Sequence, residues 1–198
     1  MKYYVGLSLS FGSSIDSGLV VMQENGDIIL IDKLYKMNDV IYFFENFSSL
    51  KNSEICVSLP WDRTMLEGKW RILSKPYQMV ATNPHMPNQN NWTQRYAHRG
   101  CEYFNSLSEQ GIPITRFELY LTRQSMHLNS CFKERSPADC KFLQNILKNE
   151  YNFEDIPTNM MPAGALEAVV GALVAREYSK GNTEPVSEFA GVDVINVK

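Results

Sequence analysis

The 198-residue sequence has no apolar run that approaches the roughly 20 residues required by a membrane-spanning helix. Its start, Met1-Lys2-Tyr3, also lacks the charged segment, apolar segment and small-residue cleavage site of a secretory signal peptide. We therefore expect a cytoplasmic protein that does not associate with a membrane.

Histidine and cysteine are scarce and widely separated. The chain has 4 cysteines and 3 histidines: Cys56, Cys101, Cys131, Cys140, His85, His98 and His127. None of them forms a Cys-x-x-Cys pair or a Cys/His pair at zinc spacing. The sequence therefore predicts reduced thiols and structural or surface histidines rather than a zinc site.

The sequence also has no excess of basic residues. The chain has 19 Lys and Arg against 22 Asp and Glu, a formal net charge of −3, whereas tight nonspecific DNA binders usually carry a basic stripe. Hydrophobic residues make up 44% and charged residues 21%, which is typical of an ordinary globular protein. The length is sufficient for a sizeable core, and one domain spanning residues 1–198 is the simplest organisation.

The first part of the chain predicts an antiparallel meander. Two segments rich in apolar residues, 3–11 and 17–23, are joined by a Gly/Ser/Asp turn. Asn25-Gly26, a strong hairpin signal, then leads into a third strand over 27–34.

The next elements predict a parallel addition to this meander. Apolar residues at helical spacing over 38–50 indicate a helix, which is followed by a short buried strand over 54–59. A strand reached through a helix normally lies parallel to its neighbour. Residues at about 61–91 contain several prolines and a polar run, and we interpret them as an irregular insertion.

The rest of the chain alternates helices and strands. We expect helices over 92–110, from Ser136-Pro137 onward and over 162–179, a strand over 114–121, and an edge strand in the tail. Small residues are frequent in the helix over 162–179, which favours close approach to a sheet.

This order of elements resembles the RNase H-like fold. In more detail, nearly the whole sequence resembles a family of predicted nucleases with that fold, domain-of-unknown-function family 429. VGLSLS (5–10) resembles the family's G-x-D strand, and ICVSLPW (55–61) its second strand, where an aspartate precedes a proline by two residues. ITRFELYL (114–121) resembles its E-x-Y-P strand, and PAGALEAVVGALVAREY (162–178) its closing D-x-x-D-A helix.

The resemblance implies an α/β fold of the RNase H-like type. We expect a mixed five-stranded sheet, made of an antiparallel three-strand meander plus parallel strands and flanked by helices.

The family's acidic positions are largely lost in this chain. Carried over residue by residue, the two strand aspartates fall on Ser8 and Ser58, and the first acid of the closing helix falls on Gly164. The strand glutamate is retained as Glu118, and the second helix acid falls on Glu167. Two of the five expected carboxylates therefore survive, both as glutamate.

These losses bear directly on metal chemistry. RNase H-type cleavage, as the resemblance implies it, uses two divalent cations about 4 Å apart that clamp the scissile phosphate. Such cations prefer anionic oxygen ligands, and a neutral serine hydroxyl is much the poorer ligand. A two-metal site is therefore not expected, and Mg²⁺ or Mn²⁺ would bind weakly if at all.

Our leading hypothesis is accordingly a catalytically degenerate protein that acts as a binding or regulatory module for nucleic acid or for a protein partner. The alternative is an active metal-dependent nuclease with a rearranged site, which uses Glu118 and Glu167 as metal ligands and Asp16 as a further catalytic acid. Each acid also has a structural interpretation, since Asp16 fits a turn, Glu118 the solvent face of a strand and Glu167 a paired helix residue.

A third hypothesis concerns the turn SFGSSIDSG (10–18), which is similar to the phosphate loop of the actin-like ATPases. Its serine hydroxyls and backbone N–H groups suit phosphate oxygens. However, those proteins place ATP between two such domains, and a chain of this length does not supply both.

Overall fold

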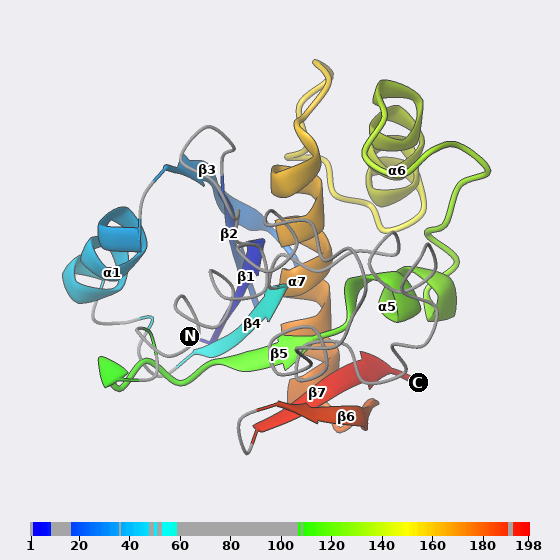
Figure 1. The fold of residues 1–198 in the computed structure, drawn as a ribbon. Helices are drawn as coiled ribbons and strands as arrows, with labels where there is room; N and C mark the ends of the chain where they lie inside the picture. Colours follow the sequence, from blue (N-terminus) through cyan, green and yellow to red (C-terminus); the bar gives the residue numbers. More distant parts are fainter. Residues whose placement is uncertain are drawn as a thin grey trace, which may run out of the picture.

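The computed structural model describes residues 2–8, 17–35, 37–47, 50, 53–58, 107, 109–189 and 192–198 (Figure 1). The insertion predicted at about 61–91 lies outside these residues, as does the helix predicted over 92–110 apart from residues 107, 109 and 110.

One mixed sheet organises the described part of the chain. Its strands are β1 (Tyr3–Ser8), β2 (Ser17–Gln23), β3 (Ile28–Leu34), β4 (Glu54–Ser58), β5 (Thr115–Phe117), β6 (Thr183–Phe189) and β7 (Val192–Val197). They lie in the order β3-β2-β1-β4-β5-β7-β6. The first three strands are antiparallel, whereas β4, β5 and β7 each run parallel to the neighbour on the β1 side. The predicted meander with added parallel strands is confirmed.

The turn between β2 and β3 forms where Asn25-Gly26 predicts it. Gly26 has φ +101°, a left-handed conformation that glycine adopts without the steric cost of a side chain. The Gln23 N–H donates to the Asp27 carbonyl at 2.9 Å and closes the hairpin.

The helices in the described part of the chain are α1 (Met37–Asn46), α5 (Leu119–Ser125), α6 (Pro137–Asn149) and α7 (Ala163–Ser179). α6 begins as predicted, because the Ser136 hydroxyl accepts a hydrogen bond from the Asp139 N–H and Pro137 occupies the first turn. Among the helices described, none is long and apolar enough to cross a bilayer.

α7 is the helix that positions the centre of the fold. It crosses one face of the sheet and contacts β1, β2 and β4 (Figure 1). Its buried alanines, valines and leucines form the hydrophobic core with side chains of the sheet and of α6. Because its small residues allow a close approach, α7 holds its side chains near the strand ends.

The prediction of a strand over 114–121 is mostly wrong. β5 contains only Thr115–Phe117, and α5 starts two residues later at Leu119. The Glu118 carboxylate accepts a hydrogen bond from the Tyr120 N–H, so it caps a helix in place of continuing the strand. Glutamate is a less usual capping residue than Ser, Thr, Asp or Asn, so the sequence gives no clear signal for the start of α5.

The C-terminal strand is also placed differently from the expectation. β7 lies between β5 and β6, so it is an interior strand and not an edge. β6, which was not predicted, forms an antiparallel hairpin with β7 and carries Pro185 at the edge of the sheet. A proline suits an edge strand, because it removes one backbone donor from a ladder that another chain would otherwise extend.

Candidate functional site

The carboxyl ends of β1 and β4 bring two serines side by side. Ser8 and Ser58 are the last residues of their strands, and they face each other in the parallel register. Both side chains are buried. The two positions that the resemblance assigns to strand aspartates therefore lie next to each other, as that resemblance requires.

Glu167 joins this pair from the face of the sheet that α7 covers. The Ser8 hydroxyl donates a hydrogen bond of 2.6 Å to Oε2 of Glu167, and both groups are buried. Gly6, two residues earlier on the same strand face, lies against the backbone of Ala168. The contact between β1 and α7 therefore sets the short distance between Ser8 and Glu167.

An arginine occupies the other side of the Glu167 carboxylate. Nε of Arg135 lies 3.1 Å from Oε1 of Glu167, and the side chain of Arg135 is one-third exposed (33%) while that of Glu167 is buried. Both oxygens of this carboxylate are therefore engaged, one by a hydroxyl and one by a guanidinium. Arg135 is not predictable as a site residue from the sequence, because only its place before the Ser136 cap distinguishes it along the chain.

A second buried carboxylate holds the backbone at Arg135. The Arg135 N–H donates to Oδ2 of Asp139 at 2.9 Å, and Arg135 has φ +60°, a left-handed conformation that is uncommon for a residue with a side chain. Asp139 also accepts two hydrogen bonds from the Arg123 guanidinium, at 2.7 and 3.1 Å, and one from the Ser130 hydroxyl at 2.6 Å.

These bonds determine the charge state of Asp139. Burial alone would raise the pKa of this carboxyl group, but the hydrogen bonds from Arg123, Ser130 and the Arg135 backbone outweigh burial. The net effect lowers the pKa of Asp139 below its ordinary value, so the carboxylate is ionised at neutral pH.

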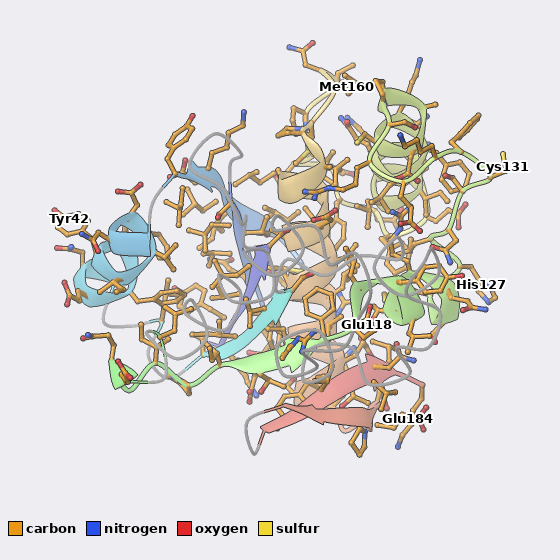
Figure 2. All side chains as sticks on the ribbon, in the orientation of Figure 1. Tyr42, Glu118, His127, Cys131, Met160 and Glu184 are labelled. Atoms are coloured by element: carbon orange, nitrogen blue, oxygen red, sulfur yellow. The ribbon has the colours of Figure 1, made fainter. Side chains whose placement is uncertain are left out.

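Glu118 is buried at the same end of the sheet but in a different orientation. Phe117 packs against α7 near Gly171, and consecutive strand residues point to opposite faces. Glu118 therefore begins on the face opposite to Glu167 and lies where β5 gives way to α5 (Figure 2). Its carboxylate caps α5. The solvent-facing interpretation of Glu118 is wrong, because only 4% of the residue is exposed.

Of the remaining predicted positions, Gly164 has a packing role and Asp16 lies outside the described residues. The backbone of Gly164 lies against Gly18 of β2, where a Cβ on Gly18 would overlap the Gly164 carbonyl. Asp16 lies outside the described residues, as do residues 10–16 of the serine-rich turn. Ser17, the serine of that turn that is described, is buried at the start of β2.

The residues that the structure describes do not form a site for a pair of divalent ions. Among the described residues, no three His, Cys, Asp or Glu side chains are grouped as metal ligands. In the described part of the chain, Glu167 is hydrogen-bonded to Ser8 of the serine pair, and its two oxygens contact Ser8 and Arg135. A cation at this carboxylate would have to displace a guanidinium, and the serines offer neutral oxygens in return.

Comparison with solved structures decides the fold. T. thermophilus RuvC in complex with a Holliday junction substrate superposes with a TM-score of 0.52 at 10% sequence identity, covering 90% of this chain and 96% of that chain. The chain has an RNase H-like fold. At this identity the likeness concerns the fold alone, and the resemblance to family 429 is not confirmed, since no family model matches.

A second Thermus thermophilus RuvC structure gives a TM-score of 0.46 at 10% identity, with the same coverage of 90% and 96%. No curated protein sequence matches the chain. The described sheet has seven strands where the sequence predicts five and an edge strand in the tail; the tail strand is β7, and β6 is the strand that was not predicted.

Proposed function

We propose that this protein is a catalytically degenerate RNase H-like protein that works as a binding or regulatory module. The observation that carries the proposal is the hydrogen bond from Ser8 to Glu167, together with Ser58 on the adjacent strand end. Two neutral hydroxyls stand where RNase H-type chemistry needs anionic oxygens, and the remaining acid accepts a bond from one of them.

The chemical consequence follows from charge. A two-metal site stabilises the attacking and leaving oxygens of a phosphodiester by holding two dications, which needs several carboxylates in one place. In this protein Glu167 carries a single negative charge, and Arg135 compensates it at 3.1 Å. Binding of dications at this centre is therefore unfavourable in both charge and ligand type.

The partner of the module is nucleic acid or a protein. The solved structure with the similar fold contains a Holliday junction, which supports a branched or duplex nucleic acid as the first partner to test. The net charge of −3 argues against tight nonspecific binding, so any such recognition depends on a local surface. We also propose that the protein is cytoplasmic and that residues 1–198 form one domain.

A nuclease assay tests the proposal. Purified protein is incubated with Mg²⁺ or Mn²⁺ and with single-stranded, duplex and four-way-junction DNA and with RNA, and binding is followed in parallel by fluorescence anisotropy with and without EDTA. We expect no cleavage, and any binding that is seen should persist in EDTA. Cleavage that Glu167→Gln abolishes would overturn the proposal and favour the alternative, an active nuclease with a rearranged carboxylate site that includes Glu167.

A further inference from the structure

We infer that the guanidinium of Arg135 is a built-in cation that takes the electrostatic place of a divalent ion beside Glu167. The inference rests on the proposed function and names the residue that maintains the metal-free state. On this inference, weak binding of divalent cations is due to Arg135 as well as to Ser8 and Ser58. Restoring an acid at a strand end is then insufficient to restore a metal site.

The first step of the argument is the pairing of Glu167. This carboxylate is buried between α7 and β1, where an uncompensated charge would be costly. In a metal-dependent site the ion supplies the compensation. Here Arg135 supplies it through Nε, and the Ser8 hydroxyl satisfies the second oxygen at 2.6 Å. Among the described residues, the charge of Glu167 is therefore compensated without an ion.

The second step is the way in which Arg135 is positioned. Its backbone is held in the left-handed region by the bond from its N–H to Asp139, at the turn that leads into α6. Arg123 fixes the Asp139 carboxylate from α5 and also donates to the Leu128 carbonyl at 3.1 Å. The segment between α5 and α6 is thus tied at both ends, and this holds the Arg135 side chain over α7.

The third step concerns the effect of this charge on an added ion. A fixed positive charge a few ångströms from a divalent cation opposes its binding, and the opposition is large where water is partly excluded. If an aspartate replaces Ser8, the acid pair formed with Glu167 still faces Arg135. We therefore expect the guanidinium, and not the missing strand acid alone, to limit the affinity for metal.

A matched set of variants tests this inference by direct binding. The proteins are Ser8→Asp, Ser8→Asp with Arg135→Gln, and Ser8→Asp with Arg135→Lys, and Mn²⁺ affinity is measured by electron paramagnetic resonance of the free ion. Removal of the charge should tighten Mn²⁺ binding by about tenfold or more. The lysine variant, which keeps the charge, should bind Mn²⁺ as weakly as Ser8→Asp alone.

Two outcomes would overturn the inference. One is equal Mn²⁺ affinity with and without Arg135→Gln, and the other is a lysine variant that binds as tightly as the glutamine variant. If Ser8→Asp does not fold, as judged by near-ultraviolet circular dichroism, the same comparison is made with Ser58→Asp on the adjacent strand. Failure here leaves the nuclease assay of the wild-type protein unaffected, so the two proposals fail separately.

Discussion

The Cα of Gly6 in β1 lies so close to the carbonyl oxygen of Ala168 in α7 that a Cβ on Gly6 would overlap it. This contact fixes how deeply α7 rests on the sheet. Because Glu167 precedes Ala168 and Ser8 follows Gly6 on the same strand face, the same contact sets the geometry of the candidate site.

Gly6→Ala should therefore destabilise the whole fold. The added methyl group meets helix backbone, which is unable to move aside as a flexible side chain would, so we expect a loss of about 3 kcal/mol or more in the free energy of unfolding. Urea denaturation measures the loss. Gly111→Ala is the matched control, because Gly111 has φ +68° but no atom within 4 Å of the added carbon.

The control should lose only about 1 kcal/mol, since the cost there arises from the backbone conformation alone. Equal losses for Gly6→Ala and Gly111→Ala would show that α7 does not rest on β1 as closely as the structure indicates.

Asp139→Asn should destabilise the protein through its buried ion pair. Arg123 and Asp139 are separated by 2.7 Å, and their side chains are only 5% and 3% exposed. Removal of one charge leaves the other buried without compensation, a change that typically costs about 3–5 kcal/mol. Thermal and urea denaturation measure this cost.

The exposed pair between Lys2 and Glu54 provides the comparison. These charges are 3.5 Å apart with side chains 39% and 34% exposed, so Glu54→Gln should change the stability by less than about 1 kcal/mol. A loss of that small size for Asp139→Asn would contradict a structural role for the Arg123–Asp139 pair.

Acidification should reduce the difference in stability between the wild-type protein and Asp139→Asn. The pKa of Asp139 is lowered in the folded state, so its stabilising contribution is complete above the unfolded pKa of about 4 and is lost as pH falls through the folded pKa. Urea unfolding of both proteins at neutral pH and at a series of values below pH 4 measures this difference.

Glu177 also has a lowered pKa, but it does not interfere with that measurement. Burial raises its pKa, but hydrogen bonds from Asn182 and Lys180 outweigh burial and lower it. Its pH dependence is present in both proteins and cancels in the difference. A difference between wild type and Asp139→Asn that stays constant below pH 4 would show that these contacts do not lower the pKa of Asp139.

The sequence by itself determined the elements whose signals are local. The Asn25-Gly26 hairpin, the Ser136-Pro137 start of α6 and the small-residue helix α7 each depend on neighbours within a few residues, and all three formed as predicted. The resemblance also placed Ser8 and Ser58 at adjacent strand ends.

Tertiary structure decided the features that depend on distant parts of the chain. Glu118 became a helix cap because β5 ends early, and β7 became an interior strand because the β6–β7 hairpin adds to the sheet beyond β5. Ser8 and Glu167 are 159 residues apart in the sequence, and no local pattern brings Arg135 to the same carboxylate. Arg135 compensates the charge of Glu167 because the turn before α6 packs over α7. Burial and pairing of this kind arise from contacts between distant elements, which the sequence does not show.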